Sequence, residues 1–461
     1  MDQGPRTFRD PFLSIYQSMV ADVARKTARE STGSATLESM DEKGDEIAAG
    51  EAIAARFAAA RLKGAGPESL MDAPATLEEM SIPENAKVCA QLALRLAWAK
   101  ATGDDATVAR IQNEEYPDSK CDPKWAATVT EYLKYFGVLG QAQIPYITPG
   151  MVGNKIVTIK ANARIGLIGD WGTGAQPAKR ILRQVKAQHP DVLIHLGDIY
   201  YSGTETECLI NFESIVDTIL DRDNTGIPVY TLAGNHDMYS GGGGYYALIK
   251  RLNRPPKTQP ASFFCLRSED NAWQLLAMDT GRFDYNPVTV THALVRVGDE
   301  ELAWHAARIQ EFPGKTILLS HHQLFSAYAQ IGAAQPNGRF LAYNTELKTA
   351  LDRLQAGGRE VAAWFWGHEH TLSVYQPYLG LRRGRCLGHS AIPVFLEDEP
   401  YKVMPEIDNP PPIVEAAKVT PTGGVYGHGF AMLALGQQTA TADYFEDRAG
   451  TAVKLHSETI S

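Results

Sequence analysis

The sequence has few of the features that mark membrane, secreted or nucleic-acid-binding proteins. No stretch of about 18 apolar residues occurs, so we expect no membrane-spanning helix. The N-terminus, MDQGPRTFRDPFL, contains no apolar segment typical of a secretory signal, and we therefore expect a cytoplasmic protein. Basic side chains are outnumbered, with 44 Lys and Arg against 54 Asp and Glu. Since binders of nucleic acids and anionic membranes usually carry basic stripes, we expect neither partner.

Cysteine is also scarce. The chain has five cysteines, an odd number, and no two of them form a CxxC pair. Such a pattern favours free thiols in a reducing compartment over a disulfide framework. The five are Cys89, Cys121, Cys208, Cys265 and Cys386.

The first third of the chain carries no motif that suggests chemistry. Its alanine-rich stretches at 47–64, 86–103 and 125–140 have apolar residues at helical spacing, and each ends at a glycine. The chain's 461 residues are enough for two or three domains. We predict a helical N-terminal region of unknown role at 1–155, followed by a catalytic domain at 156–461.

From Lys155 onward, apolar strands alternate with amphipathic helices. This pattern predicts an α/β fold with a parallel or mixed sheet that is covered on both faces. Helices are expected at 211–221 and 299–310, and another is expected to begin at Pro177. The predicted strands lie within 163–170, 191–198, 227–237, 273–280, 315–322 and 361–370.

Five of these strands end in side chains that can bind metals. The carboxyl ends of strands in α/β sheets are where ligands bind, so these five ends should meet at one rim. A mixture of carboxylate and imidazole suits Zn, Fe or Mn better than Mg or Ca. The side chains are Asp170, Asp198, Asn235 with His236, His321 with His322, and His368 with His370.

Each motif by itself also fits an ordinary structural role. Gly-Asp after a strand is a common turn or helix cap, and the two histidines of GHEH also fit a pair of surface side chains. In an extended segment these two histidines point the same way, as two ligands of one cluster would. The five motifs together, each at a strand end, favour a metal site.

These segments resemble the five motifs of the purple acid phosphatases, a branch of the calcineurin-like metallophosphoesterases. They are GDWG (169–172), GDIYY (197–201), GNHD (234–237), LSHH (319–322) and GHEH (367–370), in the family's order. The general superfamily motif begins with Asp-x-His, but here Gly172 stands at the histidine position. Purple acid phosphatases make the same change and use a tyrosine three residues after the second aspartate, which here is Tyr201. The resemblance covers residues 160–395.

The resemblance implies the superfamily's αββα sandwich, to which this chain adds its N-terminal helical region. It also implies two metal ions bridged by Asp198. One, Fe(III), would also be held by Asp170, Tyr201 and His370. The other, Fe(II), Zn or Mn, would be held by Asn235, His321 and His368.

The resemblance further suggests catalytic roles for residues beside the metals. His236 would protonate the leaving alkoxide or hold the phosphate, and Asp237 would orient the His236 ring. From the sequence, either histidine of LSHH can be the ligand. The family pattern selects His321 and leaves His322 as a phosphate contact. Trp171 and Tyr200 are expected only to pack around the site.

The predicted function is hydrolysis of a small phosphorylated substrate, with a metal-bound hydroxide attacking the phosphorus in line. We expect a phosphomonoesterase. A phosphodiesterase acting on nucleotides, cyclic nucleotides or lipid head groups is the alternative, and a catalytically silent binding protein is a third hypothesis. The metal ligands do not define the natural substrate or the oligomeric state.

Overall fold

The computed structural model describes residues 105–110, 144–200, 202–285 and 294–461. The chain divides into two compact units, 1–143 with 239–241, and 144–238 with 242–461. In the first unit the described helix is α4 (Asp105–Arg110). The helices predicted at 47–64, 86–103 and 125–140 lie outside the described residues.

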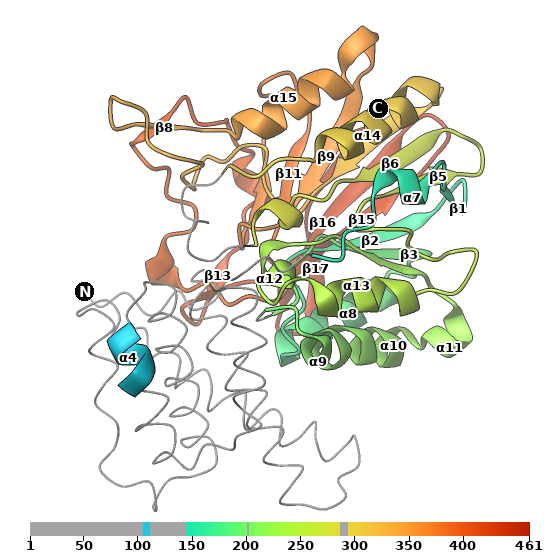
Figure 1. Cartoon of the computed structure of the whole chain (residues 1–461), viewed down its shortest axis with the longest axis horizontal. Helices are drawn as coiled ribbons and strands as arrows, with labels where there is room; N and C mark the ends of the chain where they lie inside the picture. Colours follow the sequence, from blue (N-terminus) through green and yellow to red (C-terminus); the bar gives the residue numbers. More distant parts are fainter. Residues whose placement is uncertain (1–104, 111–143, 201, 286–293) are drawn as a thin grey trace, which may run out of the picture. The chain divides into compact units, whose positions relative to one another are not determined.

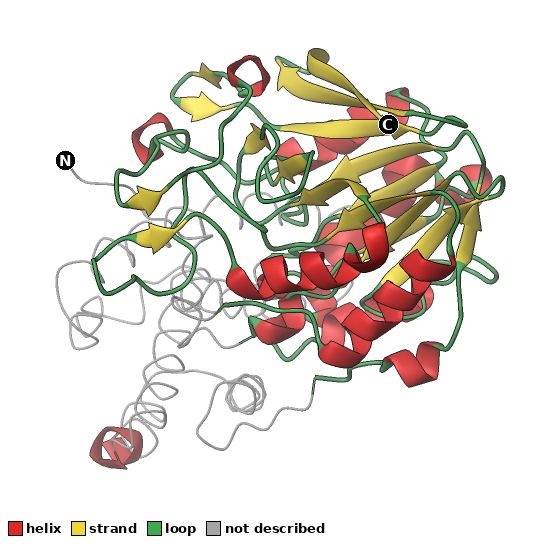
Figure 2. Cartoon of the chain, turned by 90° about the horizontal axis from the view of Figure 1, so that it is seen from above, coloured by secondary structure: helices red, strands yellow, loops and turns green. Residues whose placement is uncertain are grey.

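Two large sheets form the centre of the second unit (Figures 1 and 2). The first sheet has the strand order β1 (Val157–Ile159), β5 (Phe264–Ser268), β6 (Trp273–Ala277), β7 (Lys315–Leu319), β9 (Val361–Trp366), β11 (Gly384–Leu387) and β10 (Leu372–Val374). The second has the order β17 (Thr451–Ile460), β16 (Ala440–Arg448), β15 (Gly429–Ala434), β2 (Arg164–Ile168), β3 (Val192–His195) and β4 (Val229–Thr231).

Parallel strands lie in the middle of one sheet and at one edge of the other. In the first sheet β6, β7, β9 and β11 are parallel, β5 is antiparallel to β6 and β10 is antiparallel to β11, while β1 pairs with β5 in parallel. In the second sheet β2, β3 and β4 are parallel, and β15, β16 and β17 continue it antiparallel. Two smaller pairs are β12 (Ile407–Asp408) with β8 (Phe340–Leu341), and β13 (Pro421–Thr422) with β14 (Val425–Tyr426).

Helices cover the outer faces of both sheets. In Figure 1, α14 and α15 lie on the side of the first sheet, and α8 and α10 lie on the side of the second. The described helices of this unit are α7 (Pro149–Val152), α8 (Gln176–Ala187), α9 (Glu205–Glu207), α10 (Ser214–Leu220), α11 (Arg222–Thr225), α12 (Asn235–Met238), α13 (Gly243–Arg251), α14 (Asp299–Glu311) and α15 (Thr345–Leu354).

Side-chain alternation along the strands explains this layering. In β7, Ile317 and Leu319 belong to the core between the sheets, whereas Leu318 packs in the cluster with α14 and α15. In β3, Ile194 faces the inner core and Leu193 packs with α8 and α10. Since successive strand residues point to opposite faces, strands that are apolar throughout need cover on both sides. The result is the αββα sandwich that the resemblance implied, whereas the alternation of strands and helices had predicted a single sheet.

The predicted elements agree closely with the observed ones. Each of the six predicted strands contains an observed strand, and the helix predicted at 299–310 is α14. The helix predicted at 211–221 is α10 preceded by a π-helical turn at Cys208–Glu213. The second unit begins at Ile144 rather than at residue 156. The segment before β1 packs on the fold, since Ile147 and Val152 contact the helix-covered core of the first sheet.

Among the helices of the described residues, none combines the length and apolar character that a bilayer span requires. Cys208, Cys265 and Cys386 are buried free thiols, as predicted, while Cys89 and Cys121 lie outside the described residues.

A buried ion pair joins the two sheets. Arg385 of β11 donates two hydrogen bonds, each 2.6 Å, to the carboxylate of Glu458 on β17. The phenol of Tyr444 on β16 donates to the same carboxylate at 2.6 Å. Burial opposes ionisation of Glu458, but the hydrogen bonds and charge of Arg385 more than offset it, so the pKa of this carboxyl is lowered.

Glu458→Ala should lower the free energy of unfolding by about 3 kcal/mol near neutral pH, because it leaves the buried guanidinium of Arg385 without its partner. The group's folded-state pKa is depressed, so its contribution is present above the unfolded-state pKa of about 4.3 and is lost as pH falls through the folded-state value. Urea unfolding across pH 3–7 measures both effects. The control is Glu360→Ala, whose carboxylate pairs with Arg382 at the surface and should cost less than about 1 kcal/mol. Equal losses in the two variants would contradict the prediction.

Candidate metal centre

The predicted ligands come together at the carboxyl ends of strands from both sheets. Asp170, Asp198 and Asn235 follow β2, β3 and β4 of the second sheet. His321 follows β7 and His368 follows β9 of the first sheet. Because the sheets pack face to face, their parallel strands end at a shared edge, and the site spans the two layers.

Three of these residues have unusual backbone conformations. Asp170, Asp198 and His368 have φ values of 54°, 76° and 67°, in the left-handed region. Side chains other than glycine seldom occupy this region, and such strain costs about 1–3 kcal/mol per residue. Clustered strain of this kind is typical of functional sites.

One group of donor atoms surrounds the oxygen of a tyrosine side chain. The Tyr200 Oη lies 3.1 Å from Asp170 Oδ1, 3.2 Å from Asp198 Oδ2 and 3.2 Å from His370 Nε2. His370 Nε2 is 3.4 Å from Asp170 Oδ1. All four side chains are buried.

A second group shares the same oxygen of Asp198. Asn235 Oδ1 lies 3.0 Å from His321 Nε2 and 3.1 Å from His368 Nδ1. The two histidine nitrogens are 3.2 Å apart, and His321 Nε2 is 3.4 Å from Asp198 Oδ2. Asp198 Oδ2 therefore belongs to both groups.

These spacings fit two bound metal ions. Ligand atoms held about 2.1 Å from one ion in tetrahedral or octahedral geometry lie about 3.0–3.4 Å from one another. The distances in both groups fall within this range. Each group also combines anionic or amide oxygen with imidazole nitrogen, a donor set that suits Zn, Fe or Mn. The residues present thus fit a pair of ions that share the Asp198 carboxylate.

The His321 ring is oriented for binding by its backbone contact. Its Nδ1 lies 2.9 Å from the Leu196 carbonyl oxygen, which holds the proton on Nδ1 and turns Nε2 toward the site. Burial opposes protonation of His321, but the charge of Asp198 outweighs it and raises the pKa to about 9. For Asp198, burial is outweighed by the charges of His321 and His236, so its pKa is well below the usual range.

His236 lies beside the donor groups, as predicted. Its backbone N–H donates to Asp198 Oδ1 at 3.0 Å, and its Nε2 lies 3.9 Å from Asp198 Oδ2. Its ring packs against the ring of Tyr200 with centroids 4.5 Å apart.

Asp237 has a different role from the one predicted. Its carboxylate accepts hydrogen bonds from the backbone N–H groups of Asp198 at 2.9 Å, Ile199 at 3.1 Å and Gly234 at 2.8 Å. These contacts fasten the segment that carries Asp198 to the segment that carries Asn235. The carboxylate therefore supports the loops, and the prediction that it orients the His236 ring is wrong.

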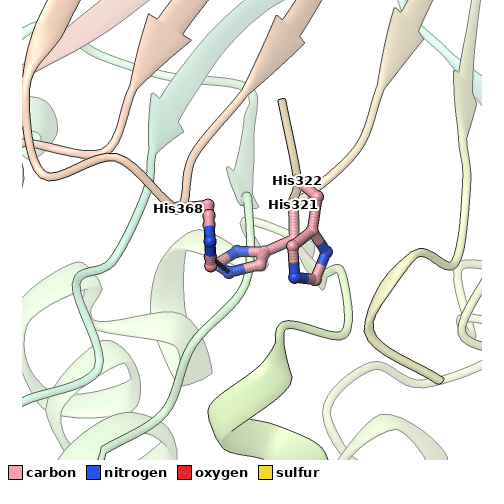
Figure 3. A group of neighbouring side chains, drawn as sticks. All are labelled: His321, His322 and His368. Carbon is pink, nitrogen blue, oxygen red and sulfur yellow. Dashed lines mark hydrogen bonds between the residues drawn. The ribbon is translucent and has the colours of Figure 1, made fainter. Parts of the chain in front are cut away.

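His322 also differs from the prediction. Its Nδ1 lies 2.9 Å from Thr280 Oγ1 and its Nε2 lies 3.0 Å from Asp284 Oδ2, so both ring nitrogens have protein partners. This arrangement leaves neither nitrogen for the predicted phosphate contact. Figure 3 shows the His322 ring grouped with those of His321 and His368, and its centroid is 4.5 Å from that of His368.

Sequence reasoning missed Thr280 and Asp284, the partners of His322. Thr280 is the last residue of the predicted strand 273–280, and nothing in the sequence around it indicated a role at the site. Burial raises the pKa of Asp284 to about 7, although the charge of His321 opposes this shift.

Tyr200 makes contacts that the sequence reasoning did not expect. It was expected only to pack around the site, yet its hydroxyl lies among three predicted ligands of one ion. Burial, together with the charges of Asp170 and Asp198, raises the pKa of this phenol well above its usual range. The predicted ligand Tyr201 lies outside the described residues.

Comparison with known proteins agrees with this geometry. The family model of the calcineurin-like phosphoesterases matches residues 163–372, which contain all the donor residues described above. This region is similar to the calcineurin-like phosphoesterases. It is similar to tartrate-resistant acid phosphatase type 5 of Rattus norvegicus, with 27% identity over 239 residues, 47% of this chain and 69% of that protein.

Solved structures similar to this chain are more distant. PhoD matches with a TM-score of 0.44 and 10% identity, covering 65% of this chain and 70% of that one. GAP50, the anchor in the inner membrane complex of Plasmodium, matches with a TM-score of 0.42 and 14% identity, covering 65% of this chain and 89% of that one.

Gly234→Ala should weaken metal binding without removing any ligand atom. A Cβ at this position would lie 2.0 Å from Asp198 Oδ1, so the carboxylate must move. We expect metal affinity to fall by about 10–100-fold, the loss usual when a ligand's support is removed. Elemental analysis after dialysis against graded chelator measures it. The control is Gly243→Ala, because a Cβ at Gly243 meets no atom within 4 Å. Equal metal affinity in the two variants would contradict the prediction.

Proposed function

We propose that this protein is a dinuclear metal-dependent phosphomonoesterase. The observation that carries the proposal is the sharing of Asp198 Oδ2 by two groups of donor atoms, each with the spacing of ligands around one ion. The motif order, the family match and the similarity to a tartrate-resistant acid phosphatase support the same function.

The donor sets suggest which metals they hold. The resemblance adds the phenol oxygen of Tyr201 to the set with Asp170 and His370, and a phenolate is a hard donor that favours Fe(III). The set with Asn235, His321 and His368 contains two imidazoles and an amide, and suits Fe(II), Zn or Mn. When bound, such ions supply Lewis-acid stabilisation of the phosphoryl oxygens and lower the pKa of bound water.

His236 is positioned to handle a proton at this site. Hydrolysis of a phosphate monoester releases an alkoxide, which leaves more readily when it is protonated. The His236 ring is 3% exposed, and its Nε2 faces the shared Asp198 oxygen at 3.9 Å. It therefore donates the proton to the leaving oxygen, while the packed ring of Tyr200 fixes its orientation.

Hydrolysis of phosphodiesters is the second candidate function, because the same donor arrangement also suits a diester substrate. The named relative is a phosphatase, which favours the monoester. A catalytically silent binding protein is less consistent with the site, since His236 and both donor sets are present together.

Turnover should be faster with p-nitrophenyl phosphate than with bis-p-nitrophenyl phosphate, and Asp198→Ala should abolish it. Removal of the shared carboxylate eliminates a ligand of both ions, so we expect a loss of more than about 100-fold, beyond that for a supporting residue. Steady-state assays with measured metal content test this. His189→Asn is the control, because His189 is exposed and Asn tolerates its φ of 53°. Dominant diester turnover would favour the alternative, and an unaffected Asp198→Ala variant would contradict metal-dependent catalysis.

His236→Gln should slow turnover of alkyl phosphates more than turnover of p-nitrophenyl phosphate. An alkoxide needs a proton to leave, whereas nitrophenolate leaves without one, so the loss of a general acid acts mainly on the alkyl substrate. We expect kcat to fall by about 10²–10⁴-fold for the alkyl substrate. Parallel kcat measurements on both substrates at equal metal content provide the test. Equal losses would instead indicate that His236 holds the phosphate.

A further inference from the structure

A cleft lies between the edge strands of the two sheets. Its lining comes mainly from the end of β10, the turn that joins β10 to β11, the beginning of β11 and the last residues of β17. The volume of the cleft is about 450 Å³. Small-molecule sites usually measure roughly 300–1,000 Å³, so the cleft is large enough for a small ligand.

The cleft and the metal centre lie at opposite ends of β11. Arg385, near the beginning of this strand, lines the cleft. Gly388 follows the last residue of the strand, and a Cβ there would lie 2.8 Å from Asp170 Oδ2. An extended chain rises about 3.3 Å per residue, so roughly 10 Å separates Arg385 from Gly388. The cleft is therefore a separate site.

Three arginines give the cleft a positive charge. Arg382, Arg383 and Arg385 line it, and the described carboxylates that pair with them are Glu458 and Glu360. Burial opposes ionisation of Glu458, but the hydrogen bonds and charge of Arg385 lower its pKa and keep it ionised near neutral pH. Three positive charges thus face two negative ones. This surplus of one occurs in a chain whose formal net charge is -10.

Arg383 has the capacity for a further partner. Arg385 holds the Glu458 carboxylate with two hydrogen bonds of 2.6 Å, whereas Arg383 Nε lies 3.5 Å from it. Arg383 also donates to the carbonyl oxygens of Ala362 at 3.4 Å and Thr459 at 2.9 Å. A guanidinium carries five N–H donors, and these contacts use three of them. The same fork of donors can bind both oxygens of a carboxylate.

Part of the cleft surface is apolar. Val374, Tyr375 and Val414 line it, and the exposed fractions of Val374 and Tyr375 are only 2% and 1%. The backbone N–H of Val414 donates to the Val374 carbonyl at 2.8 Å, which holds the two valines side by side. Such a surface favours the carbon part of a ligand, while the arginines favour its charged end.

We propose that this cleft binds a small organic carboxylate, with the carboxylate on Arg383 and the carbon part on Val374 and Val414. A ligand with one negative charge matches the surplus of one positive charge. The proposal goes beyond the proposed function and does not depend on the metal ions. Protein that binds such a ligand in the cleft but hydrolyses no phosphate ester would refute the phosphomonoesterase and leave this proposal intact.

Benzoate is a suitable probe, because it carries one carboxylate on an apolar ring. Calorimetric titration of the metal-loaded full chain should show that benzoate binds more tightly than benzamide, which has nearly the same shape without the charge. Arg383→Gln should weaken benzoate binding by about 10–100-fold, the loss usual for hydrogen bonds to a charged group. The matched control is Arg359→Gln. Arg359 also donates to two backbone carbonyls, at 2.9 and 3.3 Å, but it is not among the residues that line the cleft.

Asp198→Ala separates binding in the cleft from binding at the metal ions, which also accept carboxylate ligands. Benzoate affinity that falls in Arg383→Gln and persists in Arg359→Gln and Asp198→Ala supports the proposal. Affinity that falls in Asp198→Ala and persists in Arg383→Gln means that benzoate binds the metal ions, and this result overturns the proposal. Equal affinity for benzamide, or wild-type protein that does not bind benzoate, overturns it as well.

Thermal unfolding shows whether each variant is folded. If Arg383→Gln does not fold, Gln376→Glu decides, because Gln376 is exposed and lines the cleft. Its new carboxylate cancels the surplus positive charge and repels the probe, so benzoate affinity should fall several-fold. Unchanged affinity in Gln376→Glu would then overturn the proposal.

Discussion

The position of one carboxylate oxygen, Asp198 Oδ2, is the constraint on which the rest of the site depends. It is the point where two groups of donor atoms meet, 3.2 Å from the phenol oxygen of one and 3.4 Å from an imidazole nitrogen of the other. The backbone of Asp198 has a φ of 76°, and its other oxygen accepts the His236 N–H. Gly234 leaves room for this carboxylate where any side chain would collide with it.

Holding this arrangement costs free energy that the surrounding structure must offset. Three ligands lie in the left-handed region at about 1–3 kcal/mol each, and several ionisable groups are almost completely buried. Asp237 compensates locally by tying together the backbones of two ligand-bearing segments. The apolar core between the sheets provides the larger support, because it fixes the strands from which the ligands extend. The packed sheets and the hydrogen bonds of Asp237 thus hold the buried carboxylates and imidazoles of the site close together.

The backbone and side-chain groups around the donor residues orient the donor side chains. The backbone carbonyl of Leu196 fixes the His321 ring, and Thr280 with Asp284 fixes the His322 ring that packs on His368. Such contacts select one tautomer and one ring orientation for each imidazole. They also explain why a histidine beside a ligand is not available to bind phosphate. Its hydrogen-bonding capacity is already used within the protein.

The strand-end motifs in the sequence predicted the fold class, the strands and most of the donor residues. This was possible because apolar strands, and the Asp, Asn and His residues that follow them, are local features of the sequence. The structure brings together the donor residues that the motifs predicted, namely Asp170, Asp198, Asn235, His321, His368 and His370. The contacts of Asp237, His322 and Tyr200 were not predicted, since they join segments far apart in the chain. The Tyr200 hydroxyl, for example, contacts Asp170 and His370, which come from other strand ends. Tertiary structure decided these roles because hydrogen-bond partners such as Thr280 and Asp284, and the direction of a side chain, are set by how strands pair and pack.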